Sequence, residues 1–433
     1  MINRDRLLKD FLELVTVDGP SRRESEVAAV LRRKLEDLGL TVEFDAAGEK
    51  VGSNTDNLIA FWPAHPEGDE GRAPNFPEPV DSPNFASEEE TMGREGQLAQ
   101  LNSESPASRK GRPRKPIFSS ELAAPSLFFS CHLDTVEPTA GLKPQVKGDI
   151  ISSDGQTILG ADDRAGMAIL LEALRVIKEA GFPHGPVEIV ATVGEEIGLL
   201  GAKHLDFGKL QSRMGYVLDS GDRPGTAVVK APTEADFTIT VHGRAAHAGV
   251  EPEKGVNAIA VAAQSITQIP MGRIDPETTV SIGLIKGGKA TNIVPDLVEM
   301  QGEVRSMREE RVKELLEEIR RIFRETAQAA EATVEMRWEI DYHRFAIPPE
   351  APVVQLFQTA APRSALQAEL VTRGGGSDAN IFNEHGLQTL NLGLGMQGEH
   401  THGEHISLSD MAKAAQLVVE IIRAAASQGM PRV

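Results

Sequence analysis

The sequence predicts an α/β fold in which a mainly parallel sheet is flanked by helices and a smaller α+β domain is inserted. Short apolar runs alternate with amphipathic helices in the first and last parts of the chain, as expected of a parallel sheet covered on both faces. Between residues 229 and 342 the order changes to β-α-β-β-α-β, which is the ferredoxin-like unit. Histidines and carboxylates stand directly after several of the apolar runs.

Length and composition narrow the class of protein. The chain has 433 residues, 40% of them hydrophobic, which is enough for two or three globular domains. Its net charge of −19 argues against nucleic acid or an anionic membrane as a partner. A single cysteine, Cys131, excludes an internal disulfide and fits a reducing compartment. We see no signal peptide and no apolar stretch near the ~20 residues of a membrane helix, so we expect a cytoplasmic protein.

The N-terminal segment is expected to contain two helices and two strands. An apolar stripe at helical spacing predicts a helix around residues 7–15. Ser21 with Glu24 three positions later forms a capping-box pattern, which predicts a second helix from Ser21 up to Gly39. Short strands are expected at 40–44 and 57–61.

Residues 63–125 differ in composition from the rest of the chain. They are rich in proline, acidic at first and basic at the end, and they show no period of a helix or strand. We interpret this segment as a disordered insertion, because it cannot bury enough apolar surface to offset its ordering entropy. The basic end could be a docking patch, although a solvated linker is the simpler interpretation.

The remaining elements alternate again. The expected strands and helices of the large domain lie at 127–131, 164–180, 187–193, 197–204, 216–218, 353–367, from 378 onward, 389–392 and 409–426. Those of the small domain lie at 237–242, 255–269, 278–285, 297–305, 309–330 and 333–340. The large domain is therefore expected to comprise residues 1–228 and 343–433, with the small domain, 229–342, inserted between them.

Metal-ligating side chains follow five segments of the predicted large domain. They are His132 with Asp134, Asp162, Glu195 with Glu196, Asp219, and His400. In open α/β sheets, ligands bind outside the carboxyl ends of the strands, so these side chains should meet at one edge. Imidazole and carboxylate groups suit zinc, cobalt or manganese. The set is too large for one tetrahedral ion but fits two ions, with one carboxylate left over as a general base.

Each of these residues also has a structural interpretation. Asp162 suits a helix N-cap, the pair Glu195-Glu196 suits the first turn of a helix, and Asp219 suits a turn. Their joint order, each at a strand end or in a loop at the same edge, favours the metal site.

The ordered set resembles the co-catalytic metallopeptidase family that includes peptidase T, glutamate carboxypeptidase and aminoacylase, and it looks most similar to the peptidase T-like branch. The resemblance covers nearly the whole chain except 63–125. The matching strings are CHLDTV (131–136), GADDRAG (160–166), GEEIG (194–198), LDSG (218–221), GRAAHAG (243–249), NIVPD (292–296) and GEVRS (302–306).

The resemblance implies a role for each site residue. His132 and Asp219 would hold one divalent ion, Glu196 and His400 the other, and Asp162 would bridge both; zinc is expected, with cobalt or manganese as alternatives. Asp134 would orient His132 and Glu195 would be the general base. The residues expected to bind substrate are His247, Asn292, Arg305, Gly376 and Ser377. His402 is an alternative to His400 as the ligand, although His400 fits the family spacing to Glu404 and Ile406 better.

The resemblance also implies an activity. We expect a metal-dependent exopeptidase of short peptides, in the form of a tripeptide aminopeptidase. It would act as a homodimer whose inserted domain lends His247 to the partner's site. The same metals would also serve an amidohydrolase or carboxypeptidase acting on N-acyl amino acids or C-terminal residues. A non-catalytic binding protein on the same fold is the third and least favoured interpretation.

Overall fold

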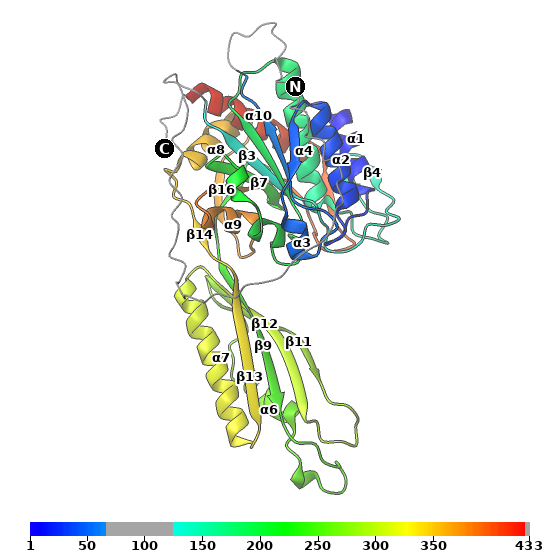
Figure 1. Cartoon of the computed structure of the whole chain (residues 1–433), viewed down its shortest axis with the longest axis vertical. Helices are drawn as coiled ribbons and strands as arrows, with labels where there is room; N and C mark the ends of the chain where they lie inside the picture. Colours follow the sequence, from blue (N-terminus) through cyan, green and yellow to red (C-terminus); the bar gives the residue numbers. More distant parts are fainter. Residues whose placement is uncertain (66–123, 429–433) are drawn as a thin grey trace, which may run out of the picture. The chain divides into compact units, whose positions relative to one another are not determined.

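The computed structural model describes residues 1–65 and 124–428, so most of the predicted insertion lies outside the described residues. Two main sheets are present, each with its own hydrophobic core (Figure 1). The predicted α/β fold with an inserted α+β domain is confirmed. None of the described helices combines the length and apolar composition needed to span a bilayer.

The larger sheet has nine strands in the order β1-β2-β6-β3-β7-β16-β8-β14, with β15 beside β8. Strands β6, β3, β7 and β16 pair in parallel, whereas β1, β2, β8 and β14 form antiparallel pairs around them. Their bounds are β1 Thr41–Phe44, β2 Leu58–Trp62, β3 Leu127–His132, β6 Val187–Thr192, β7 Met214–Ser220, β8 Thr226–Ala231, β14 Phe345–Ala346, β15 Glu369–Thr372 and β16 Gln388–Gly393.

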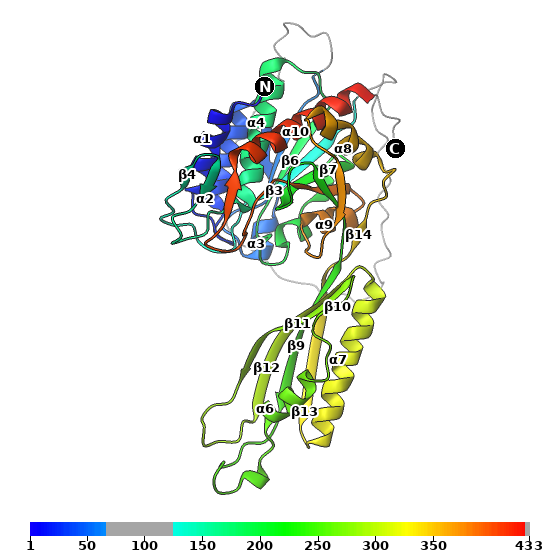
Figure 2. The same ribbon diagram turned by 180° about the vertical axis from the view of Figure 1, so that it is seen from behind.

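Helices cover both faces of this sheet (Figures 1 and 2). Strand β3 illustrates the two buried faces. Leu127, Phe129 and Cys131 pack into a core on one face of the sheet, and Phe128 packs into a second core on the opposite face. A strand buried on both faces is apolar throughout, and for that reason these strands were visible in the sequence. The helices on the first core are α1 (Arg4–Val15), α2 (Ser25–Asp37), α4 (Ala161–Ala180), α8 (Pro352–Arg363) and α10 (Leu408–Gln428), and α9 (Asp378–Glu384) packs on the second.

Several short elements were not predicted. They are α3 (Ala47–Val51), two 3-10 turns, the strands β8, β14, β15 and β10 (Gly272–Asp275), and a three-stranded sheet of β4 (Gln145–Lys147), β5 (Ile150–Ser152) and β17 (His405–Ser407). Strand β17 pairs antiparallel with β5. This pairing fixes the end of the loop that carries His400.

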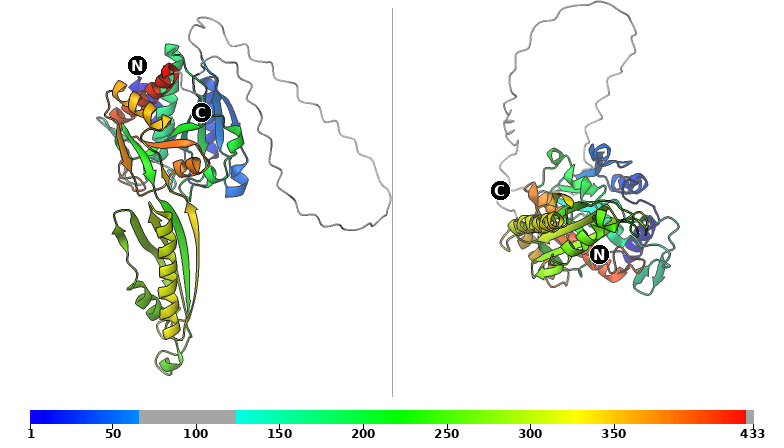
Figure 3. Two further views of the ribbon diagram at one scale, coloured as in Figure 1. Left: turned by 90° about the vertical axis from the view of Figure 1, so that its left-hand side faces the viewer. Right: turned by 90° about the horizontal axis from the view of Figure 1, so that it is seen from below.

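The inserted domain, expected at 229–342, contains a five-stranded antiparallel sheet in the order β10-β11-β12-β9-β13. This sheet begins at Thr233, because residues 229–231 belong to β8 of the larger sheet. Apart from β10, the strand order is that of the ferredoxin-like unit. Figure 3 shows helix α7 along one face of the sheet, where α6 also packs. The bounds are β9 Thr233–His242, α6 Ala258–Ile266, β10 Gly272–Asp275, β11 Thr278–Gly287, β12 Leu297–Ser306, α7 Glu309–Ala329 and β13 Thr333–Tyr342.

Two local predictions are wrong. Helix α2 begins at Ser25 rather than Ser21, because the buried Glu24 carboxylate accepts the backbone N–H of Gly194 as well as that of Arg22. Ser21 and Glu24 therefore do not form a capping box; the Glu24 side chain makes a tertiary contact instead. The helix predicted at 197–204 is reduced to α5 (Leu200–Lys203), because Leu199 adopts a left-handed φ of 56° that interrupts a regular helix.

Candidate metal and catalytic site

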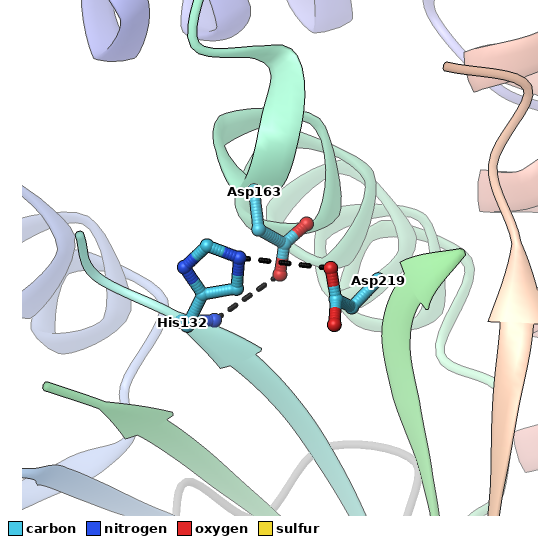
Figure 4. Close-up of side chains that lie close together, drawn as sticks. All are labelled: His132, Asp163 and Asp219. Carbon is cyan, nitrogen blue, oxygen red and sulfur yellow. Dashed lines mark hydrogen bonds and ion pairs between the residues drawn. The ribbon is translucent and has the colours of Figure 1, made fainter. Parts of the chain in front are cut away.

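Most of the predicted metal ligands lie at the carboxyl ends of the parallel strands. Strand β3 ends at His132, Asp219 is the penultimate residue of β7, and His400 lies in the loop after β16. Because these strands run in parallel with β6, which precedes Glu195 and Glu196, all of them deliver side chains to one edge. Figure 4 shows His132 facing Asp219, with Asp163 beside them at the start of α4.

Asp162 lies between the two imidazoles. Its Oδ1 is 2.9 Å from His132 Nε2, and its Oδ2 is 3.3 Å from His400 Nε2. Asp219 Oδ1 is 3.6 Å from His132 Nε2, and Glu196 Oε2 is 3.0 Å from His400 Nε2. One carboxylate thus presents a different oxygen to each half of the cluster, which is the arrangement expected of a ligand shared by two ions.

No lysine or arginine in the described part of the chain pairs with the carboxylates of this cluster. Among the described residues, the ion-pair partners of Asp162, Glu196 and Asp219 are imidazoles only. Burial and the nearby Asp162 raise the pKa of Asp219, and hydrogen bonds to Asp162 and Glu196 raise the pKa of His400 to about 10.

A divalent cation fits this donor set. Glu196 Oε1 is buried and has no hydrogen-bond partner among the described residues, so one carboxylate oxygen remains to be satisfied. The converging donors are imidazole nitrogens and carboxylate oxygens, which zinc, cobalt and manganese accept. A cation there would also offset the repulsion among the carboxylates.

Glu195 differs from its neighbour Glu196. Its carboxyl group makes no hydrogen bond or ion pair within the part of the chain that the structure describes. Burial, followed by the charge of Asp219, raises its pKa. A partly buried carboxyl group without a partner, beside a cation site, is available to accept and return a proton.

Asp134 connects the imidazole to both glutamates. Its Oδ1 lies 3.3 Å from His132 Nδ1 and accepts the Glu195 N–H at 3.0 Å, while its Oδ2 accepts the Glu196 N–H at 3.2 Å. Ser21 donates its hydroxyl to the same carboxylate at 2.7 Å. A single buried carboxylate therefore orients the ring and the segment that carries the glutamates.

Two further carboxylates support the site, and sequence reasoning assigned them no role there. Asp163 accepts the backbone N–H groups of His132 (3.1 Å) and Gly166 (3.0 Å). Glu404 accepts those of Gly160 (2.6 Å) and Asp162 (3.0 Å), and burial raises its pKa to about 7. The sequence held a signal for each of them. Asp163 is adjacent to the predicted ligand Asp162, and Glu404 follows His400 at the spacing of the family motif.

The two candidate histidines of the C-terminal loop have different surroundings. His400 has a left-handed φ of 60°, and its ring contacts Asp162 and Glu196. The ring of His402 instead lies 3.0 Å from Glu137, and both of these side chains are exposed. The structure therefore brings His400, and not His402, into the cluster.

The expected substrate-binding residues are spread over three places. Gly376 and Ser377 immediately precede α9, and Arg305 lies near the end of β12. His247 and Asn292 lie in neighbouring loops beyond the far end of β9, where the Ala248 N–H donates to the Asn292 carbonyl. No contact among the described residues joins these two loops to the metal cluster.

Comparisons with known proteins cover nearly the whole chain. The uncharacterised protein YqjE of Bacillus subtilis is 36% identical over 426 residues, which are 98% of this chain and 100% of the relative. The crystal structure of aminopeptidase PepT from Bacillus cereus matches with 37% identity and a TM-score of 0.79 over 98% of this chain and 100% of that chain. A tripeptidase structure from Staphylococcus aureus matches with 35% identity and a TM-score of 0.83 over 99% and 100%.

Two family descriptions match parts of the sequence. The peptidase dimerisation domain matches residues 234–331, and peptidase family M28 matches residues 119–247. Together with the full-length similarities, they confirm the resemblance that the sequence motifs predicted. The chain belongs to the peptidase T-like branch of the co-catalytic metallopeptidases, enzymes that hydrolyse peptide bonds.

Proposed function

We propose that this metallopeptidase is an aminopeptidase that releases the N-terminal residue of tripeptides with the help of two zinc ions. The observation that carries the two-ion site is the position of Asp162, whose two oxygens face the imidazoles of His132 and His400. The choice of substrate is supported by the aminopeptidase from Bacillus cereus and the tripeptidase from Staphylococcus aureus, which match the chain over almost its full length.

The proposed ligands follow from the contacts. His132 and Asp219 would hold one ion and Glu196 and His400 the other, with Asp162 shared between them. The ions would supply Lewis acidity toward water and toward the scissile carbonyl group. Asp134 would keep Nε2 of His132 directed at its ion, because Nδ1 faces the Asp134 carboxylate.

Glu195 would carry the proton. Its carboxyl group would remove a proton from the attacking water and then deliver it to the nitrogen of the leaving amine. The hydrogen bond from its backbone N–H to Asp134 fixes the main chain at this point, so that only the side chain needs to move.

His247 would stabilise the oxyanion. Its Nδ1 accepts the backbone N–H of Gly249 at 3.2 Å, which leaves the proton of the neutral ring on Nε2 as a donor. Asn292 on the adjacent loop would contact the same part of the substrate. Arg305, whose guanidinium binds Glu303 in the structure, would exchange that contact for the substrate carboxylate.

A dimer would bring His247 to a catalytic site. Strand β9 has ten residues, so His242 at its end lies roughly 30 Å from Thr233 at its start. His247 follows beyond that end and is therefore remote from Pro232, where its own chain passes from the large sheet into the inserted domain. A partner subunit would supply it, and the match to a peptidase dimerisation domain supports this arrangement. We further propose the cytoplasm as the location, because the one cysteine is free and buried.

Substrate cleavage tests the proposal. The metal-loaded protein would be given a tripeptide, its N-acetylated form, an N-acetyl amino acid and a dipeptide, and products would be identified by mass spectrometry. We expect release of the N-terminal residue from the free tripeptide alone, and loss of this activity with a chelator. Cleavage of the acetylated compounds would indicate an amidohydrolase, and release of the C-terminal residue a carboxypeptidase. Absence of any hydrolysis would contradict the proposal.

Complementation tests the shared site. His247→Ala and Glu195→Gln would each be inactive alone, whereas co-expressed subunits would regain about a quarter of the wild-type activity, because half of the dimers would hold one complete site. Failure of the mixture to gain activity would contradict donation of His247 by the partner.

A further inference from the structure

The inserted domain is joined to the large domain by two short crossings. Strand β8 ends at Ala231 in the large sheet and β9 begins at Thr233, so Pro232 alone forms the first crossing. The second comprises His343 and Arg344, between β13 and β14. The two crossings also contact each other, because the Arg344 N–H donates to the Thr233 hydroxyl at 2.9 Å.

One buried side chain binds both crossings. Asn380, in helix α9, is only 1% exposed. Its Nδ2 donates to the carbonyl oxygens of Pro232 (3.2 Å) and His343 (2.8 Å). A side-chain amide has two N–H donors, so both N–H groups of Asn380 are used in hydrogen bonds to the two crossings.

The same side chain also binds the loop expected to face substrate. Asn380 Oδ1 accepts the backbone N–H of Ser377 at 3.2 Å. The neighbouring Gly376 packs directly on the inserted domain, since an added Cβ would lie 2.2 Å from the Tyr342 ring. The Tyr342 hydroxyl in turn accepts a hydrogen bond from Arg305 at 3.1 Å. The loop, both crossings and the proposed carboxylate anchor therefore form one continuous set of contacts.

We infer that Asn380 is a positioning residue that couples the orientation of the inserted domain to the geometry of the loop at Gly376-Ser377. If the inserted domain swings relative to the large domain, Pro232 and His343 must move with respect to α9, and the amide restrains both. The inference rests on the proposed function only in taking this loop to face substrate. Its consequence is that loss of the amide donors changes catalysis without any change at the metal ligands.

Asn383 provides a matched control on the same helix. It also donates twice, to the carbonyl oxygens of Ala379 and Thr389 (both 2.8 Å), and accepts once, from the Thr389 N–H at 3.0 Å. All of its partners belong to the large domain. Asn380→Asp and Asn383→Asp therefore remove the same two donors and keep the same acceptor, but only the first touches the crossings.

Steady-state kinetics and hydrogen exchange test the inference. Per folded, metal-loaded molecule, we expect Asn380→Asp to lower kcat/KM about tenfold or more and Asn383→Asp less than about twofold, because small misplacements of a substrate-facing group are costly. Backbone hydrogen exchange should become faster at residues 226–232, 343–347 and 374–378 in Asn380→Asp but not in Asn383→Asp. Equal kinetics, or unchanged exchange at the crossings, would overturn the inference. A wild-type enzyme without peptidase activity would instead contradict the proposed function.

A second pair guards against misfolding of the aspartate variant. Asn380→Ala and Asn383→Ala remove the amide without placing a carboxylate against two carbonyl groups, and the same contrast is expected. In the wild type, a phosphinic tripeptide analogue should slow exchange at 374–378 and at both crossings together. Protection of the loop without the crossings would count against the coupling, whatever the variants do.

Discussion

Two groups of three carboxylates in this protein balance their charge in different ways. Asp162, Glu196 and Asp219 meet at the edge of the large sheet, where their ion-pair partners among the described residues are imidazoles. A second group on the inserted domain, Glu234, Asp236 and Glu303, has oxygens within 4.8 Å of one another.

The second group contains its own cation. Arg305 donates two hydrogen bonds of 2.9 Å to Glu303, and its Nη1 lies 3.1 Å from Glu234. A guanidinium fork satisfies a carboxylate in both charge and geometry, so this group needs no bound ion. Spacing of acidic residues alone therefore does not distinguish the two groups; the side chains that face them do, since imidazoles face the first and a guanidinium faces the second.

Asp162→Asn is expected to have the largest effect. The substitution replaces one carboxylate oxygen by an NH2 group, which cannot bind a metal ion, and so removes the shared ligand. Metal content should fall from about two ions per chain to below about one, and activity should be lost. Elemental analysis after gel filtration measures this. Glu303→Gln in the second group is the control, and loss of metal in that variant would break the comparison.

Glu195→Gln should separate the chemistry from metal binding. We expect kcat to fall by about 10²–10⁴-fold, because the amide cannot accept a proton, while metal content stays unchanged. Single-turnover hydrolysis of a tripeptide with parallel metal analysis provides the measurement. The exposed Glu137→Gln serves as control, and near-normal turnover in Glu195→Gln would rule this residue out as the base.

Glu234 should make the inserted domain less stable at high pH. Burial raises its pKa to about 7, so its contribution to the free energy of unfolding is fully present below pH 4.5 and is lost as the pH rises through about 7. The loss should be on the order of 2 kcal/mol, and Glu234→Gln should remove this pH dependence.

Tryptophan fluorescence can report this effect from the inserted domain alone. The chain has two tryptophans, and in a Trp62→Phe background the remaining Trp338 lies on β13. Urea unfolding between pH 5 and 8 would then give the stability at each pH. If the free energy of unfolding changed equally with pH in the Glu234 variant and its parent, a group other than Glu234 would cause the pH dependence.

Asp236→Asn should have the smallest effect. This side chain is largely exposed, and partial desolvation, followed by the charge of Asp341, raises its pKa. Removing the charge should stabilise the inserted domain at pH 8 by about 0.5 kcal/mol or less, as for other surface charges. The same fluorescence assay measures it, and a large destabilisation would mean that Asp236 takes part in the ion network of Arg305.

Much of the large domain was predictable because its signals are local. The strands that precede His132 and Asp219 are buried on both faces, so they stand out as continuous apolar runs. The residues after such runs meet at one edge whenever the strands are parallel. Glu24 shows where this reasoning fails, since its spacing from Ser21 indicated a helix cap although its decisive partner, Gly194, is 170 positions away.

The sequence by itself determined the fold class, the strands that carry polar residues at their ends, and the family. Only the tertiary structure decided that Asp162 faces both imidazoles while Asp163 binds backbone N–H groups, and that Asn380 holds both crossings. The physical reason is the distance along the chain over which each kind of interaction acts. Periodicity and strand ends depend on neighbouring residues, whereas hydrogen bonds and charge balance depend on distances through space between segments far apart in the chain.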